Sequence, residues 1–185
     1  MKLTVNTRSG ARKSEAEQAR RAGQIPAILY SPGQTNELLL ISNAEFTAVL
    51  RNMKLGQLPT TTFTLSINGK ERKAVVKDIQ YEPTSYRVIH LDFQELIDGK
   101  LIAVKVPVTC IGMMDCPGLK LGGFLRQVKR HVKVECTPDR MPKELIVNIK
   151  DLNIKQAKRL SDIAIPEGVR PLISPDEVLV VIAKK

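Results

Sequence analysis

Two side chains suited to proton transfer or hydrogen bonding, His90 and Asp92, lie two residues apart in the segment 88–93. Apolar residues alternate with them, which predicts a β-strand with one apolar and one polar face. Residues two apart on a strand point the same way, so the pair could offer a donor and an acceptor to a partner. The alternation is also typical of a half-buried strand whose outer face is merely solvated, and the period alone favours that second interpretation.

Catalysis by His90 would need an orienting group and either a nucleophile or a substrate pocket. Asp92 is about 6–7 Å away along an extended backbone, and the chain contains no G-x-S-x-G nucleophile motif. With two histidines in the whole chain, acid and base mechanisms have few candidates. We therefore expect that the protein is not an enzyme.

Sequence motifs give little support for a metal site or a phosphate-binding loop. Cys110, Cys116, His131 and Cys136 include no C-x-x-C pair, and the last two fall on opposite faces of a predicted strand. The glycines of segment 118–123 lack the P-loop Lys-Ser/Thr and the dinucleotide-binding spacing. We expect neither a metal nor a cofactor.

The charge indicates the class of partner. The chain has 29 Lys and Arg against 19 Asp and Glu, a net charge of +10 and a pI near 9.7. Residues 1–94 contain 13 basic and 8 acidic side chains and the remainder 16 and 11, so both halves are basic. This favours a polyanionic partner. Aromatic residues make up only 4%, which argues against recognition by base stacking.

No apolar run is long enough to span a bilayer, and the N-terminus lacks the pattern of a signal peptide. Three cysteines, an odd number in a chain of this size, fit a reducing compartment. We expect a cytoplasmic protein without a membrane partner.

Residues 1–94 are predicted to form a small, closed or nearly closed β-barrel with two helices. The predicted strands are 2–8, 25–30, 37–41, 60–67, 72–81 and 88–93, and the predicted helices are 12–22 and a second one from the capping box at 42–45 through Leu50. Asn68-Gly69 predicts a tight hairpin turn between two of these strands. The first helix is basic and offers only alanines for packing, so it could order on a phosphate backbone or be an ordinary solvated helix.

Residues 95–185 are predicted to form a second, all-β domain, a sandwich or small barrel. The predicted strands are 101–109, 128–136, 145–149 and 177–182, with a long loop marked by the glycines at 118–123. Pro107 predicts that the first of these strands lies at a sheet edge, because proline cannot donate to a ladder.

Three blocks in the first half resemble the family of bacterial large-subunit ribosomal proteins that bind 5S ribosomal RNA. The blocks are RRAGQIPAILY at 20–30, KDIQ at 77–80 and HLDF at 90–93, and their order and spacing also match. The second half resembles the C-terminal domain of that family's long two-domain form, the general stress protein CTC type. The segments that show this second resemblance are 106–108, the loop through 122–123, 141–144, 161–163 and 165–169.

The resemblance implies a six-stranded N-terminal barrel that docks on the loop E region of 5S rRNA as a structural part of the large subunit. It implies that the protein is a monomer within the ribosome, with neighbouring large-subunit rRNA and ribosomal proteins as further partners. Carried over position by position, the RNA-binding residues would be Arg8, Arg20, Arg21, Tyr30, Gln80, His90 and Asp92. Arginines would hold phosphates while the strand residues hydrogen-bond groups in the wide minor groove.

The chain departs from the family pattern in several places. Ala19 replaces a larger aliphatic residue and Ser31 a glycine, which affects packing or turn geometry without removing a proposed contact. The second domain is more basic than the family pattern, for example at 149–150 and 158–159, which suggests an additional RNA contact. An alternative function is a stress-linked, ribosome-associated factor whose C-terminal domain binds a protein partner.

Overall fold

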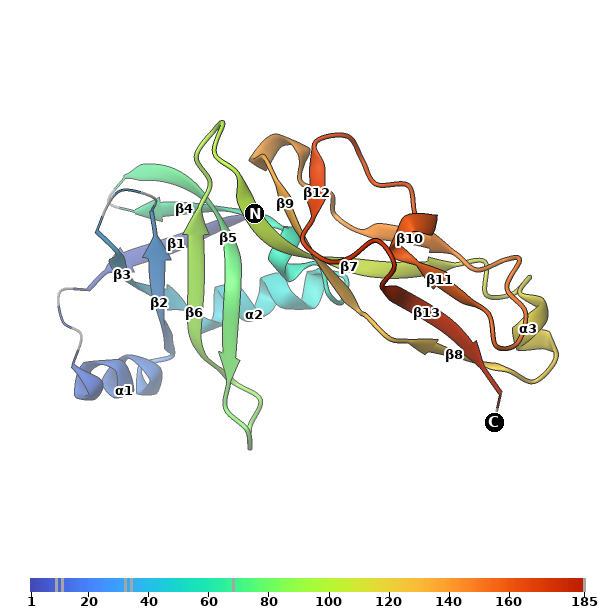
Figure 1. Cartoon of the computed structure of the whole chain (residues 1–185). Helices are drawn as coiled ribbons and strands as arrows, with labels where there is room; N and C mark the ends of the chain where they lie inside the picture. Colours follow the sequence, from blue (N-terminus) through green and yellow to red (C-terminus); the bar gives the residue numbers. More distant parts are fainter. Residues whose placement is uncertain (9, 11, 32, 34, 68, 185) are drawn as a thin grey trace. The chain divides into compact units, whose positions relative to one another are not determined.

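The computed structural model describes residues 1–8, 10, 12–31, 33, 35–67 and 69–184 of the chain (Figure 1). The chain divides into two compact units, Met1–Lys100 and Leu101–Lys185. Both are built mainly from β-strands, which confirms the predicted fold class.

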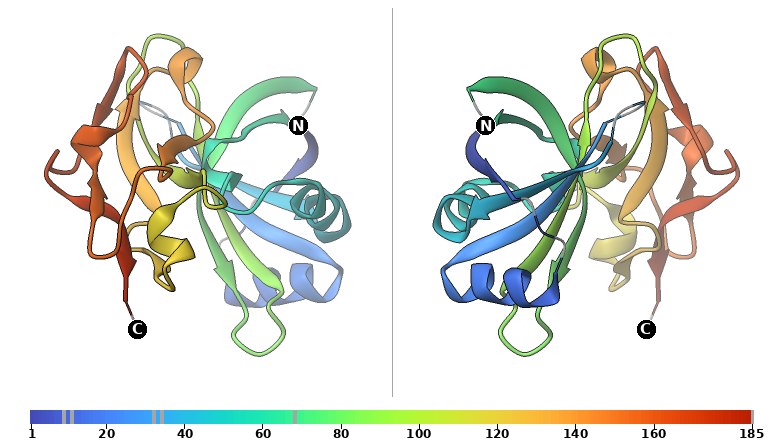
Figure 2. Two further views of the ribbon diagram at one scale, coloured as in Figure 1. Left: turned by 90° about the vertical axis from the view of Figure 1, so that its right-hand side faces the viewer. Right: turned by 90° about the vertical axis from the view of Figure 1, so that its left-hand side faces the viewer.

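The first unit is a closed six-stranded barrel with strand order β1-β3-β2-β6-β5-β4 (Figures 1 and 2). The strands are β1 (Lys2–Thr7), β2 (Gln24–Tyr30), β3 (Glu37–Ser42), β4 (Thr62–Ile67), β5 (Lys70–Tyr81) and β6 (Val88–Glu95). The helices are α1 (Lys13–Arg21) and α2 (Asn43–Asn52), and a short 3-10 helix, η1, covers Leu58–Thr60. The predicted barrel with two helices is confirmed.

Two parallel pairings complete the barrel, β1 with β4 and β2 with β6, and the remaining neighbours are antiparallel. Inward-facing residues alternate with outward-facing ones along the strands. The core that they form is aliphatic except for three phenylalanines. Phe63 lies between Phe93, at a centroid distance of 6.0 Å, and Phe46 of α2, at 6.4 Å. Helix α2 therefore contributes directly to the barrel core.

Both predicted helices form close to their predicted bounds. Only Ala19 of α1 is buried, as expected from a helix whose apolar residues are alanines. Gly23 follows the helix with φ of +75°, a left-handed conformation that glycine adopts without a steric penalty. At the start of α2, Ser42 Oγ accepts a hydrogen bond from the Glu45 N–H at 3.5 Å, as the capping-box prediction requires.

The β4–β5 connection includes Gly69, whose φ is +80°. Its predicted turn partner, Asn68, lies outside the described residues. Strand β5 is twelve residues long and its register against β6 shifts between Val76 and Asp78 and again between Gln80 and Tyr81. Such irregularities bend a strand and redirect its side chains.

The second unit contains two sheets, with strand orders β10-β7-β9-β12 and β11-β13-β8. The strands are β7 (Ile102–Ile111), β8 (Phe124–Gln127), β9 (His131–Cys136), β10 (Leu145–Asn148), β11 (Ala157–Arg159), β12 (Val169–Pro171) and β13 (Val178–Ala183). Short helices cover α3 (Pro117–Lys120), η2 (Pro138–Arg140) and η3 (Leu160–Asp162). The prediction of a second all-β half is confirmed, although α3 lies in the segment expected to be a loop.

Strand β7 is not at a sheet edge, so the edge prediction from Pro107 was wrong. Residues 102–107 pair with β9, and parallel pairing with β10 begins only at Val108. The Val108 N–H donates to Arg130, and neighbouring N–H groups point to opposite sides of a strand. The nitrogen of Pro107 therefore faces away from β9, just before the β10 pairing starts, where a missing donor is tolerated.

Candidate nucleic-acid interface

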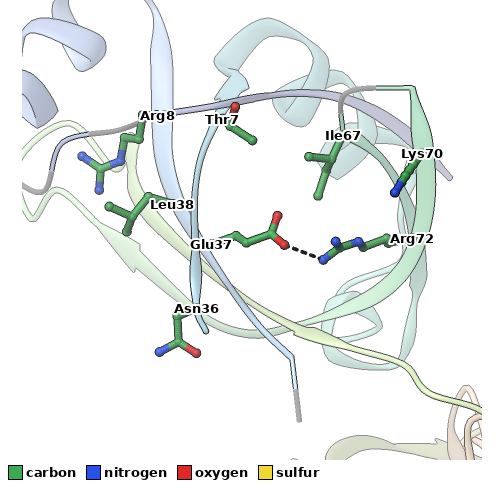
Figure 3. A pocket seen from close by; sticks show the side chains of 8 residues that line it. All are labelled: Thr7, Arg8, Asn36, Glu37, Leu38, Ile67, Lys70 and Arg72. Atoms are coloured by element: carbon green, nitrogen blue, oxygen red, sulfur yellow. Dashed lines mark hydrogen bonds and ion pairs between the residues drawn. The ribbon is translucent and has the colours of Figure 1, made fainter. Parts of the chain in front are cut away.

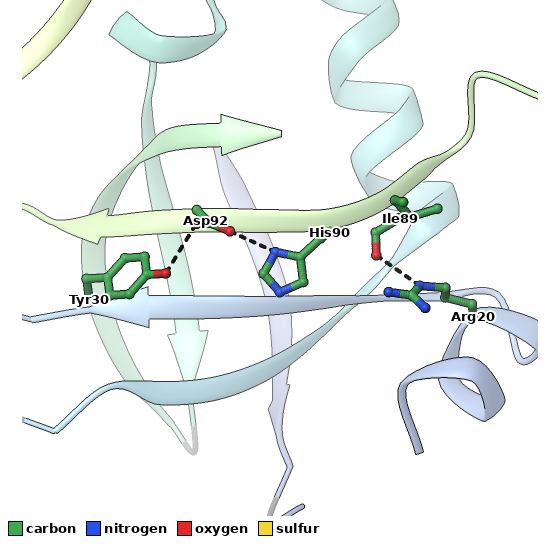
Figure 4. A network of polar contacts seen from close by, with 5 residues as sticks. All are labelled: Arg20, Tyr30, Ile89, His90 and Asp92. Atoms are coloured by element: carbon green, nitrogen blue, oxygen red, sulfur yellow. Dashed lines mark hydrogen bonds and ion pairs between the residues drawn. The ribbon is translucent and has the colours of Figure 1, made fainter. Parts of the chain in front are cut away.

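Three polar side chains form a hydrogen-bonded row on the outer face of β2 and β6 (Figure 4). His90 Nδ1 lies 2.7 Å from Asp92 Oδ1, and the Tyr30 hydroxyl donates to Asp92 Oδ2 at 3.2 Å. The side chains of His90 and Asp92 are only 17% and 23% exposed. They form an ordered, half-buried group, which a freely solvated polar face would not show.

The parallel pairing of β2 with β6 brings these residues together. Ile28 pairs with Asp92, and Tyr30 follows two residues later on the same face. The intervening Leu91 and Phe93 are fully buried in the barrel core. The backbone is thus anchored by apolar packing directly beneath the polar row.

Asp92 holds one hydrogen bond on each carboxylate oxygen. A carboxylate only accepts, so Nδ1–H of His90 donates to it, and in the neutral imidazole the lone pair is on Nε2. Burial, and then the charge and hydrogen bond of Asp92, raise the pKa of the Tyr30 hydroxyl above its ordinary value. Tyr30 is therefore a neutral donor at physiological pH.

Gln80 extends this row onto the neighbouring strand. It pairs with His90 in the β5–β6 ladder, and its side chain is exposed. The shifts in register on either side of it are features of tertiary structure that local sequence patterns do not reveal. The structure therefore brings together the predicted residues Tyr30, Gln80, His90 and Asp92.

Arg20 and Arg21 come from α1, at the end of the helix nearest β6. Arg20 Nε donates to the Ile89 carbonyl at 3.0 Å, a bond that holds the helix against the strand (Figure 4). Both arginines border a pocket of about 380 Å³. Its other lining residues are Gly23, Gln24, Ile25, Asn43, Glu82, Arg87, Val88 and Ile89. Sequence patterns did not single out Arg87, which the β5–β6 connection places beside the two helix arginines.

Arg8 lies elsewhere on the barrel. It borders a second pocket, of about 580 Å³, formed by the ends of β1 and β4 and the beginnings of β3 and β5 (Figure 3). Arg72 in the same pocket is ion-paired to Glu37 at 2.7 Å and lies 3.8 Å from Glu95. The Nε and Nη1 atoms of Arg8 are buried without a hydrogen-bond partner among the described residues. The structure thus does not join Arg8 to the Tyr30–Asp92–His90 network.

No group of three or more potential metal ligands occurs among the described residues. All three cysteines are free, and burial raises the pKa of the Cys110 and Cys136 thiols. Cys116 instead donates to the Leu152 carbonyl at 3.2 Å. In the described part of the chain, no helix combines the length and apolarity needed to cross a membrane.

Comparison with known proteins gives matches along almost the whole chain. Residues 3–93 match the model of the ribosomal L25p family, and residues 101–185 match that of the C-terminal domain of ribosomal protein TL5. Similar proteins include the large ribosomal subunit proteins bL25 of Chlamydia trachomatis serovar L2, Chlamydia muridarum and Chlamydia pneumoniae, at 45%, 43% and 39% identity. Each of these alignments covers 100% of both chains.

Proposed function

Because the chain belongs to the large ribosomal subunit protein bL25 family, in its long two-domain form, we propose that it binds 5S rRNA at the loop E region through its first unit. Membership in a ribosomal protein family confirms the expectation of a non-enzymatic protein of the large subunit. In this proposal the partners are 5S rRNA, adjoining large-subunit rRNA and ribosomal proteins, and the chain acts as a monomer.

The Tyr30–Asp92–His90 network carries the proposal. Groups that read RNA must be fixed in place, since each hydrogen bond to a 2′-hydroxyl or base edge depends on direction. Asp92 orients both neighbours, so Nε2 of His90 and the ring of Tyr30 keep one position before RNA arrives. Such preorganisation lowers the entropy lost on binding.

The arginines of α1 supply the phosphate contacts. Arg20 uses only Nε for the bond to Ile89, and its terminal nitrogens remain able to donate to a phosphate. Arg21 is exposed beside it, and Arg87 adds a third cation at the rim of the same pocket. The positive charge lies next to the polar row, as the phosphate backbone of an RNA duplex lies next to the groove that exposes its hydrogen-bonding groups.

Arg8 would bind from a separate position. Buried guanidinium nitrogens without a partner are unfavourable in the free protein, and a phosphate oxygen would satisfy them once the Arg8 side chain turned outward. This gives Arg8 a physical reason to contact RNA although it is not part of the row.

A competition gel shift tests the proposal. The full chain is titrated against 5S rRNA in the presence of an unrelated RNA duplex of equal length, at several salt concentrations. We expect 5S rRNA to bind more tightly at every salt concentration. Equal affinity for the two RNAs would reduce the interaction to non-specific charge attraction and contradict the proposal.

A further inference from the structure

The outer face of the sheet β7-β9-β12 in the second unit carries a pair of lysines in direct opposition. Lys105 of β7 pairs with Lys133 of β9 in the antiparallel ladder. Their strand neighbours Val104, Val106, Val132 and Val134 are buried, so both lysine side chains point to the opposite, exposed face.

The hydrogen-bond pattern brings these two lysines especially close. Val108 and Arg130 form a hydrogen-bonded pair, and such pairs alternate along an antiparallel ladder. Lys105 and Lys133 therefore form a non-hydrogen-bonded pair, in which Cα atoms are only about 4.5 Å apart. Like charges directly opposite each other on a sheet are destabilising, so this pair contributes nothing to the stability of the unit.

Neither lysine forms an ion pair with a residue that the structure describes. Other cations of the unit do, such as Lys129 with Glu177 at 2.7 Å and Lys150 with Asp115 at 3.1 Å. Acidic side chains on the same face are Glu135, which pairs with Ala103 and Arg170, and Glu144, which accepts a hydrogen bond from Thr109. Glu135 therefore lies two residues from Lys133 and opposite Arg170 without an ion pair to either lysine, and the net charge of Lys105, Lys133, Glu135 and Arg170 stays positive.

Two more exposed side chains lie on the same face. Arg170 of β12 carries a further positive charge, and His131, next to Lys133 in the alternation of β9, can donate a hydrogen bond from its ring. We call Lys105, His131, Lys133 and Arg170 the cationic stripe. It runs across three neighbouring strands, and segment 101–185 as a whole has 15 basic and 9 acidic residues.

We propose that the cationic stripe binds the phosphate backbone of ribosomal RNA, as a contact additional to that of the first unit. Lysine acts on phosphate as a point charge, and two ammonium groups side by side match successive phosphates of one strand. An exposed sheet face suits this role, since backbone contacts need no pocket and position an RNA without reading its sequence. The family to which the chain belongs works in the large ribosomal subunit, where RNA is the abundant polyanion.

The test uses the full chain and large ribosomal subunits washed with high salt until they lack the protein. Binding is measured as a function of salt for the wild type, for Lys105→Gln/Lys133→Gln and for the matched control Lys120→Gln/Lys150→Gln. The control removes the same charge from the same unit, at the segment around α3, away from the stripe. We expect the stripe variant to reduce the slope of log affinity against log salt by about two units and to bind about ten-fold more weakly.

The control should behave like the wild type, and Lys105→Arg/Lys133→Arg should restore binding because it keeps the charge. If the stripe variant binds like the control, the proposal is wrong. Amine-directed crosslinking of the wild-type complex identifies the partner. Crosslinks from Lys105 and Lys133 to RNA support the proposal, whereas crosslinks to an acidic ribosomal protein instead would overturn it.

Discussion

At the scale of single residues, the structure changes the role of Asp92. Both of its carboxylate oxygens are already engaged within the protein, by His90 and by Tyr30. In the proposed function its main contribution is therefore to position the histidine and the tyrosine, while any remaining lone pairs can accept from a 2′-hydroxyl. In the proposed function the pair is a fixed recognition surface and not a catalytic dyad.

His90→Ala and Asp92→Ala should each lower the affinity for 5S rRNA by about ten-fold or more, in line with roughly 1–3 kcal/mol for a directional contact. Neither should change the salt slope, because neither side chain neutralises a phosphate. The double variant should lose less than the sum of the two single losses, since Asp92 acts through His90 and Tyr30 and its effect through His90 is already absent from His90→Ala. Fully additive losses in the titration would show that Asp92 does not act through His90.

Arg20→Ala should reduce the salt slope by about one unit, as expected for the loss of one phosphate contact. It also removes the bond to Ile89, so helix α1 should become less ordered. Arg20→Lys is the matched control, because lysine keeps the charge but not the Nε geometry. A salt slope equal to the wild type for Arg20→Ala would exclude a phosphate contact at this position.

Tyr30 should titrate above pH 10, because burial and Asp92 raise its pKa from the ordinary value of 10.0. A raised folded-state pKa means that its contribution to stability is fully present below pH 10 and is lost as the pH rises through the folded-state value. Phenolate absorbance of the wild type and of Tyr30→Phe should therefore differ only above pH 10. A transition below pH 10 that disappears in Tyr30→Phe would contradict this assignment.

At the scale of elements, α1 and the strands beside it depend on different forces. The helix buries little apolar surface, so its position rests on the end at Gly23 and on the bond from Arg20 to the Ile89 carbonyl. Strand β6 is held by complete burial of Leu91 and Phe93. The helix is thus the part of the proposed interface that a local substitution can displace without unfolding the barrel.

Gly23→Ala should destabilise the first unit by about 1 kcal/mol, because alanine disfavours the φ of +75°. An added Cβ would meet no atom within 4 Å, so the effect comes from backbone conformation alone. The urea midpoint measures the loss, and Gly23→Asn should lose less because asparagine tolerates this conformation better. Equal losses for the two variants would point to a steric clash instead.

At the scale of the whole molecule, the two units differ in their proposed tasks. The polar row, the α1 arginines and Arg8 all belong to Met1–Lys100, whereas the cationic stripe belongs to Leu101–Lys185. A boundary at 94/95 was predicted from sequence. Leu96 is 9% exposed and donates its N–H to the Lys73 carbonyl of β5, so a fragment that ends before it would lose this hydrogen bond and a buried side chain.

A fragment of residues 1–100 should unfold cooperatively and keep the preference for 5S rRNA over an unrelated duplex. For binding to large subunits, its slope of log affinity against log salt should be smaller than that of the full chain, because the cationic stripe is missing. Denaturation monitored by circular dichroism establishes folding before binding is measured. A folded fragment without 5S binding would contradict the assignment of this activity to the first unit.

Local patterns in the sequence determined much of the fold. Alternation predicted β6 and which of its residues face the core, and the capping box and Gly23 predicted the helix bounds, because period and capping depend on residues close in sequence. Short strands such as β8, β11 and β12 were missed, because three or four residues are too few to show the alternation of apolar and polar side chains that marks a strand. The edge position inferred from Pro107 failed because strand neighbours depend on distant segments.

The sequence by itself determined the basic character of both halves, the strand that carries His90 and Asp92, and the family resemblance of its three blocks. Only the tertiary structure decided that Tyr30 bonds to Asp92, that Arg8 lies apart from them, and that Lys105 opposes Lys133. The physical reason is strand register. Hydrophobic burial sets the face of each strand locally, but pairing between segments far apart in sequence sets which side chains on that face become neighbours.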